Sequence, residues 1–181
     1  MDSDVWSGIA HKDHPEIVRQ VHEDYIEAGA QVITANTYST ARHVLESIDL
    51  GDQVRRINVE AVELAKAARD NVANGEVWIA GSISSMAPFK NQEEVAEGDS
   101  IESNYREMAE ILAEAGVDLI IVEMMRETVN STLIIEAALS TGLPVWIGYS
   151  AMLADDGKSV INWRWKNVDS KPPTGDFEKL V

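Results

Sequence analysis

Four short apolar segments constrain the fold of this chain more than any other feature of its sequence. They read QVITANTY at 31–38, VWIAGSIS at 77–84, DLIIVEMM at 118–125 and PVWIGYS at 144–150. None of them shows the strict alternation of apolar and polar residues that is typical of a strand with one solvated face. A continuous apolar run of this length is typical of a strand buried on both faces. The pattern therefore predicts a parallel sheet that is covered by helices.

Segments with helical periodicity separate these strands. Helices are predicted over 15–28, 52–74, 100–115 and 129–140. Gly29 and Gly116 stand where a helix commonly ends. The same joint, a Glu-Ala-Gly helix end and an apolar strand start, occurs at 27–33 and again at 114–120. It fits either a true internal repeat or a joint that α/β proteins reuse.

The alternation of helix and strand predicts one α/β domain over residues 1–181. Right-handed crossovers would wind the strands into either an open, doubly wound sheet or part of a (β/α)8 barrel. No G-x-G-x-x-G or G-x-x-x-x-G-K-[ST] motif follows a strand, which weakens the nucleotide-binding forms of the open sheet. A complete barrel has eight strands in typically ~250 residues. Because only four clear strands are visible, the fold is either open or an incomplete barrel.

The charge balance excludes several classes of function. The chain has 15 basic and 31 acidic residues and a formal net charge of −16, so its surface repels nucleic acids and anionic membranes. No apolar run is long enough to span a bilayer and the N-terminus does not resemble a signal peptide, so we expect a cytoplasmic protein. Cysteine is absent, which excludes disulfides, thiolate metal sites and cysteine nucleophiles within these residues.

In parallel α/β folds, functional side chains gather at the carboxyl ends of the strands. Glu123 is the most informative candidate, because it ends an apolar strand where a carboxylate needs a partner. It could receive a cationic group of a ligand, such as a substrate ammonium. It could instead form an internal ion pair, for example with Arg106 or Arg126.

The other candidates are polar residues that end the remaining strands: Asn36, Thr37, Tyr38, Ser82, Ser84, Tyr149 and Ser150. The group at 36–38 could orient a small polar ligand, or it could satisfy the backbone of a turn. Ser82 and Ser84 could offer hydroxyl groups to an anionic ligand, although plain loop serines are more common.

No other motif points to a different chemistry. His11 and His14 have a possible metal spacing, but a solvated helix start explains the pair better. A G-x-S-x-G nucleophile elbow is absent, so nothing favours a hydrolase triad. The segment Trp163-Arg-Trp fits a packed hairpin arm better than a nucleic-acid platform in so acidic a chain.

Four blocks in this sequence resemble, in the same order, the homocysteine S-methyltransferase family. The most specific block runs over 14–38, from His-Pro-Glu-Ile-Val to Thr-Ala-Asn-Thr-Tyr. The other three are AGSI at 80–83, LAEAGVDLIIVE at 112–123 and GLPVWI at 142–147, and the match covers roughly 5–150. The resemblance implies parallel (β/α) units of a TIM-type barrel, of which this chain would hold about half.

The resemblance also implies a reaction, methyl transfer to the thiol of homocysteine to give methionine. In the family, three cysteines hold a zinc ion that keeps the thiol as a thiolate. Glu123 matches the glutamate that receives the amino group of homocysteine, and Tyr38 matches an aromatic residue that lines the pocket. Asn36 and Thr37 share that motif, and Ser82 is the fifth expected substrate-binding residue. No residue of this chain is assigned a catalytic or metal-binding role.

The sequence departs from the family pattern in several places, and these departures lead to further predictions. The acidic-Gly-Gly strand expected before Val5 and the zinc cysteines are missing, and Ser84-Ser85 replaces the usual Gly-Pro. The chain therefore looks like a family member truncated at both ends. Without zinc, a thiol with a pKa of about 8.5 is mostly protonated at neutral pH, so we expect no methyltransferase activity from this polypeptide alone. A half barrel has two open edges, which predicts self-association.

Two other functions remain compatible with the sequence. A non-catalytic α/β module could retain the family scaffold and bind a small amino acid or a protein partner. A TIM-barrel lyase or synthase that uses Glu123 as a base would need a phosphate or metal site, which the sequence does not show. The expected partners are small molecules, homocysteine and a methyl donor, and the residues do not distinguish S-methylmethionine, betaine and a folate–cobalamin system.

Overall fold

The structure is a computed structural model that describes residues 7–85, 99–125, 128–154, 156–158 and 160–162. Its strands are β1 (Val32–Thr34), β2 (Trp78–Ser84), β3 (Leu119–Met125), β4 (Val145–Tyr149), β5 (Ala151–Leu153) and β6 (Val160–Asn162). Its helices are α1 (Ala10–Asp13), α2 (Pro15–Glu27), α3 (Arg42–Glu46), the 3-10 turn η1 (Gly51–Gln53), α4 (Val54–Val72), α5 (Asp99–Ala115) and α6 (Thr128–Leu139).

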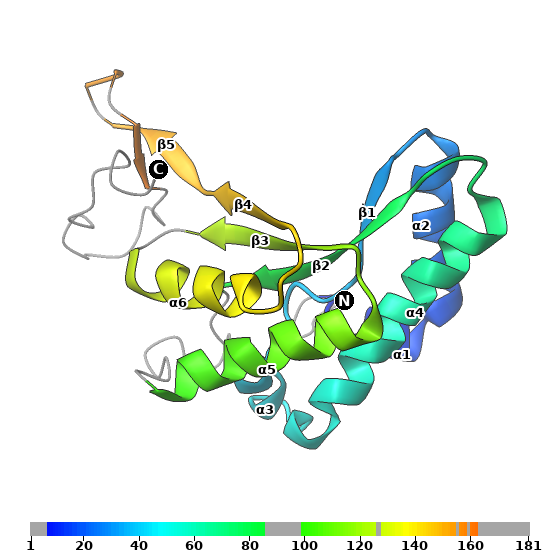
Figure 1. Cartoon of the computed structure of the whole chain (residues 1–181), viewed down its shortest axis with the longest axis horizontal. Helices are drawn as coiled ribbons and strands as arrows, with labels where there is room; N and C mark the ends of the chain where they lie inside the picture. The colour runs from blue at the N-terminus through cyan, green and yellow to red at the C-terminus, as the bar shows by residue number, and fades with distance from the viewer. Residues whose placement is uncertain (1–6, 86–98, 126–127, 155, 159, 163–181) are drawn as a thin grey trace.

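The first four strands form one sheet in the order β1-β2-β3-β4 (Figure 1). Each strand pairs in parallel with the strand before or after it in the chain. The prediction of a parallel α/β sheet wound from consecutive strands is therefore confirmed. This sequential order is also the order of strands in a (β/α) barrel.

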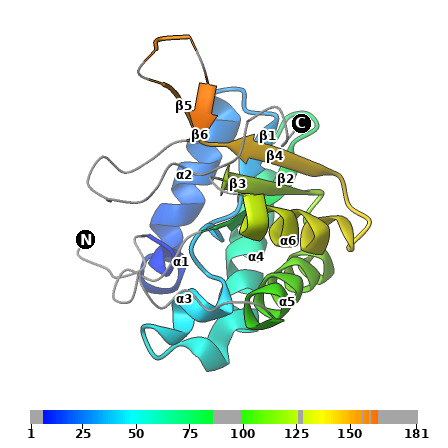
Figure 2. The ribbon, with the colours of Figure 1, turned by 90° about the vertical axis from the view of Figure 1, so that its left-hand side faces the viewer.

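Helices α4, α5 and α6 lie on the same side of the sheet in two views (Figures 1 and 2). The core between helices and sheet contains Ile79 and Ile83 of β2 together with Met108 of α5. Gly81 faces the same helix, because a Cβ built on it would lie 3.0 Å from a methyl group of Leu112. Since side chains alternate along a strand, the even-numbered residues of β2 point to the opposite face of the sheet.

The sequence-based helices and joints agree well with the structure. All four predicted helices form, with limits that differ by at most two residues from those expected. Gly29 and Gly116 follow α2 and α5 with φ angles of +98° and +83°, the left-handed conformation that a glycine helix cap adopts. The repeated joint at 27–33 and 114–120 is therefore the same local structure used twice.

The predicted strand 31–38 is shorter than expected, because β1 ends at Thr34. A turn follows it, and the short helix α3 comes next, which the sequence pattern did not predict. The segment 144–150 also differs from expectation. Trp146 and Ile147 of β4 are 50% and 44% exposed, although the apolar run predicts burial on both faces. The physical reason is that β4 is the last strand of the sheet in the described part of the chain, where β3 is its one neighbour.

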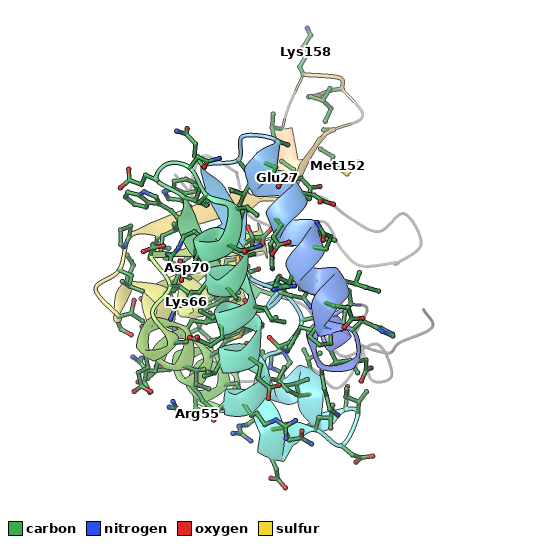
Figure 3. The ribbon with its side chains drawn as sticks, turned by 90° about the vertical axis from the view of Figure 1, so that its right-hand side faces the viewer. Glu27, Arg55, Lys66, Asp70, Met152 and Lys158 are labelled. Carbon is green, nitrogen blue, oxygen red and sulfur yellow. The ribbon has the colours of Figure 1, made fainter. Side chains whose placement is uncertain are left out.

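Beyond β4, strands β5 and β6 form a small antiparallel hairpin. The hairpin projects away from the body of the molecule, in which Arg55, Lys66 and Asp70 lie along α4 (Figure 3). Trp163 and Trp165 lie outside the described residues. The described helices lack the length and apolar character that crossing a bilayer requires.

Candidate functional site

Three polar side chains form a hydrogen-bonded chain across the carboxyl ends of β1, β2 and β3. The Ser82 hydroxyl donates to Oε1 of Glu123 at 2.7 Å. The Thr37 hydroxyl donates to the Ser82 carbonyl and accepts the Ser82 N–H, both at 2.9 Å. Thr37 and Ser82 are fully buried, so neither hydroxyl is free to exchange its partners for water. These hydrogen bonds therefore fix the direction in which Ser82 presents its hydroxyl to Glu123.

The Glu123 carboxylate is half-buried and lies on the face of the sheet opposite the helices, the face of Ser82. Its second oxygen, Oε2, has no hydrogen bond or ion pair to any residue in the described ranges. The internal ion pair considered from the sequence is not formed with Arg106, which pairs with Glu102 at 2.9 Å. Arg126, the other alternative, lies outside the described residues. A carboxylate with one oxygen held and one available is a suitable acceptor for an ammonium group.

The end of β3 has an irregular backbone. Met124 has a φ angle of +58°, and among the described residues only Asp49 shares this feature outside glycine. The register between β3 and β4 shifts at the same place, between Val122 and Met125. On the other side, Ser84 of β2 stays paired with Glu123. The irregularity is thus a β-bulge directed toward β4.

Asn36 and Tyr38 lie beside this chain of hydrogen bonds but have other partners. The Asn36 amide donates to the carbonyl of Ser7 at 2.7 Å and lies 3.3 Å from Nδ1 of His11. Burial lowers the pKa of His11, which favours a neutral ring whose Nδ1 can accept the amide hydrogen. The Tyr38 carbonyl accepts a hydrogen bond from Ser84 at 2.6 Å, and its side chain is half-buried.

Thr40 and Asn58 anchor the turn that carries these residues, and neither was predicted from the sequence. The Thr40 hydroxyl donates to the side-chain oxygen of Asn58 at 2.6 Å, and the Asn58 amide returns a bond to the Thr40 carbonyl at 3.0 Å. Both side chains are fully buried. One signal was available, because Asn58 is a polar residue on the apolar face of the predicted helix 52–74.

The chain offers no fitting set of ligands for a zinc ion of the kind expected in the family. It has no cysteine. The parts of the chain that the structure describes bring together no group of three or more His, Asp or Glu side chains that could hold a metal.

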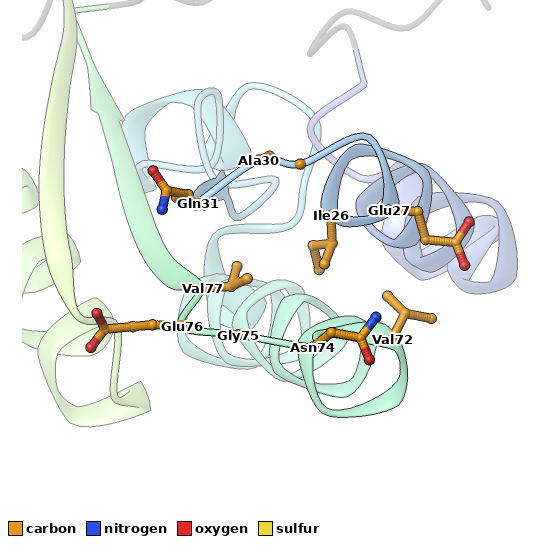
Figure 4. A pocket seen from close by; sticks show the side chains of 10 residues that line it. Ile26, Glu27, Ala30, Gln31, Val72, Asn74, Gly75, Glu76 and Val77 are labelled. Carbon is orange, nitrogen blue, oxygen red and sulfur yellow. The ribbon is translucent and has the colours of Figure 1, made fainter.

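A pocket of about 250 Å³ opens at the opposite end of the sheet, where β1 and β2 begin. Ile26 and Val77 point into it, whereas the carboxylates of Glu27 and Glu76 point away from its centre (Figure 4). Ligand sites of parallel α/β folds lie at the carboxyl ends of the strands, and this pocket lacks convergent polar groups. We therefore place the candidate site at Glu123.

Several curated proteins named as homocysteine S-methyltransferases are similar to this chain. Betaine–homocysteine S-methyltransferase 1 of Sus scrofa is 25% identical over 146 residues, which cover 77% of this chain and 50% of that protein. The Danio rerio protein of the same name is 28% identical over 77% of this chain and 34% of its own length. S-methylmethionine–homocysteine S-methyltransferase BHMT2 of Pongo abelii is 26% identical over 78% of this chain and 36% of that protein. The match with this chain thus spans between a third and a half of the length of these relatives.

Solved structures show the same relationship at the level of the fold. The metallated form of the homocysteine methyltransferase MmuM from Escherichia coli matches with a TM-score of 0.68 and 24% identity, over 86% of this chain and 58% of that chain. The oxidized form matches with a TM-score of 0.63 and 25% identity, over 82% and 56%. The prediction of parallel (β/α) units of an incomplete TIM-type barrel is confirmed by this likeness. A family model described as homocysteine S-methyltransferase matches residues 1–169, so the chain belongs to the homocysteine S-methyltransferase family.

Proposed function

We propose that this chain supplies the homocysteine-binding part of a homocysteine S-methyltransferase, with Glu123 as the acceptor for the amino group of homocysteine. The observation that carries the proposal is the half-buried Glu123 carboxylate at the end of β3, with Oε1 bound to Ser82 and Oε2 without a partner among the described residues. Family membership supplies the substrate class. The relatives named for homocysteine methylation support the same choice.

In this proposal the residues at the ends of β1 and β2 have positioning roles. Ser82 occupies Oε1 and leaves Oε2 to the ammonium, and Thr37 holds Ser82 through two main-chain hydrogen bonds. Asn36 and Tyr38, which lie beside these residues, form one wall of the proposed homocysteine site. Fixing the amino group at Glu123 would orient the rest of homocysteine, so that its sulfur reaches one defined place. In the reaction the sulfur forms a bond to the methyl carbon of the donor as the bond from that carbon to the donor breaks.

We further propose that the 181 residues alone bind homocysteine but do not methylate it. A free thiol has a pKa of about 8.5 and is mostly protonated at neutral pH. No cysteine or three-residue metal group in the described parts is available to keep it as a thiolate. The same observation favours the second candidate function, a binding module that retains the scaffold without catalysis. Methionine formation from homocysteine with S-methylmethionine or betaine, measured on this chain, would contradict both statements.

Isothermal titration calorimetry with L-homocysteine and with 4-sulfanylbutanoate, which lacks the amino group, tests the role of Glu123. We expect the chain to prefer homocysteine, and Glu123→Gln to weaken homocysteine binding by roughly tenfold to a hundredfold, as expected for loss of a charged hydrogen bond. Binding of the analogue should change little. Glu110→Gln removes one exposed carboxylate of α5 and serves as the matched control. An unchanged homocysteine affinity in Glu123→Gln would remove the assignment.

A further inference from the structure

The bulge at the end of β3 inserts one extra residue beside Glu123. Val122 pairs with Ile147, and the next pair is Met125 with Tyr149. Two residues of β3, Glu123 and Met124, therefore lie opposite the single residue Gly148. Bulges are uncommon between parallel strands, and where they occur they often redirect a side chain next to a functional site.

The bulge changes which face the following side chain occupies. In a regular strand Met125 would share a face with Glu123, because alternate side chains point the same way. Met125 is instead fully buried in the same core cluster as Val122, whose neighbours come from the helices. Glu123 keeps its hydrogen bond to Ser82 on the other face. The extra residue thus allows β3 to present a carboxylate on one face and return at once to the apolar core.

Hydroxyl groups from both neighbouring segments hold the bulge in place. Ser85, just after β2, donates to the Met124 carbonyl at 3.1 Å. Ser150, just after β4, donates to the Met124 sulfur at 3.2 Å, and its N–H donates to the Met125 carbonyl at 2.9 Å. A left-handed φ is unfavourable for a residue with a side chain, so these contacts and the surrounding pairing maintain it.

We propose that Met124 is a positioning residue for homocysteine binding: its left-handed backbone sets the bulge that directs the Glu123 carboxylate toward the amino group. The inference deepens the proposed function and rests on it. Met124 itself contacts no substrate in this account and acts through Glu123. What the position requires is the backbone angle, which glycine adopts freely and a β-branched residue resists.

Two substitutions separate the backbone angle from the methionine side chain. Met124→Gly removes the side chain but allows the positive φ, whereas Met124→Val retains a side chain and opposes it. Asp49→Val is the matched control, because Asp49 has a φ of +59° on the exposed turn after α3. For each variant we would measure the ratio of the affinities for homocysteine and 4-sulfanylbutanoate. We would also measure the 13C chemical shift of the Glu123 carboxyl carbon, which reports its surroundings, and the midpoint of thermal unfolding.

We expect Met124→Val to reduce the affinity ratio by roughly tenfold and to move the Glu123 carboxyl shift. Met124→Gly should keep the ratio and the shift, and Asp49→Val should lower the thermal midpoint while leaving both unchanged. The inference is overturned if Met124→Val keeps the ratio and the shift, or if Asp49→Val alters them equally. Equal binding of the two ligands by the unmodified chain would refute the proposed function instead, and the carboxyl shift would still report whether Met124 orients Glu123.

Discussion

Strands β3 and β4 have similar apolar sequences and lie side by side, but their surroundings differ. Ile120 and Val122 of β3 are fully buried, because strands flank β3 on both sides and helices cover the face on which these two side chains lie. Trp146 and Ile147 of β4 remain about half exposed at the edge of the sheet. An apolar run therefore predicts a strand whose side chains need to be shielded from water. It does not predict which residues shield them.

The sharpest test of this difference is truncation of one isoleucine in each strand. Ile120→Ala should destabilise the chain by about 2–5 kcal/mol, because it removes buried methyl groups and leaves a cavity. Ile147→Ala should cost about 1 kcal/mol or less, because much of that side chain is already in water. Urea denaturation of both variants gives the two free energies of unfolding. Equal losses would show that β4 is as well covered as β3.

The exposed apolar surface of β4 also bears on association. We propose that copies of the chain associate through the β4 edge. Among the described strands, β4 pairs only with β3, and a strand with a free edge and apolar side chains readily pairs with another chain. Trp146→Lys should weaken the association by roughly tenfold. The control is Trp78→Lys, at a tryptophan of similar exposure that begins β2.

Sedimentation velocity over a range of protein concentrations measures this association. Because each chain has a net charge of −16, copies repel one another and added salt should strengthen the association. A monomer at every concentration and salt level would contradict the proposal, and so would an equal effect of the two tryptophan substitutions.

The end of the molecule where α1 and α2 pack against α4 should differ from the β4 edge in its response to pH. Burial lowers the pKa of His11 and His22 from the ordinary value of 6.5. For His11, the carboxylates of Glu60 and Asp13 oppose this shift with smaller effects.

In the unfolded chain these histidines gain a proton near pH 6.5, whereas in the folded chain they gain it only at lower pH. The unfolded state therefore binds more protons just below pH 6.5, so stability is complete above that pH and falls as the pH decreases through this window. Urea unfolding from pH 7.5 downward should show the loss. His11→Gln should reduce its slope, whereas the exposed His14→Gln should not. Identical slopes in the two variants would contradict this account.

Much of the fold was predictable because it depends on local patterns. Helical periodicity and glycine caps located the four long helices, and the apolar runs located the strands. The extent of β1 was not predictable. After β1 ends, the contact with β2 continues through a hydrogen bond from the Thr37 side chain to Ser82, and these two residues are distant in sequence. The short helix α3 was missed for a similar reason. Its first residue, Arg42, is held by a two-point ion pair with Glu107 of α5.

The site was predictable only as a set of strand ends. The rule that parallel strands end at one edge selected Glu123, Thr37 and Ser82, and the structure brings these three together. The rule could not assign Ser82 as the partner of Glu123, because that pairing depends on the register of β2 against β3. Nor could it reveal the positive φ of Met124, since nothing in the residue type indicates such an angle.

The sequential pairing of the strands has a consequence for how the molecule is made. Ser82 and Glu123 come from the consecutive strands β2 and β3, and Thr37 comes from the turn after β1, so all three residues of the hydrogen-bonded group are present once the polypeptide has been synthesised to residue 123. Contacts between consecutive elements form earlier than contacts between distant ones. A nascent chain leaving the ribosome can therefore assemble the carboxylate and its supporting hydroxyls before β4 has emerged.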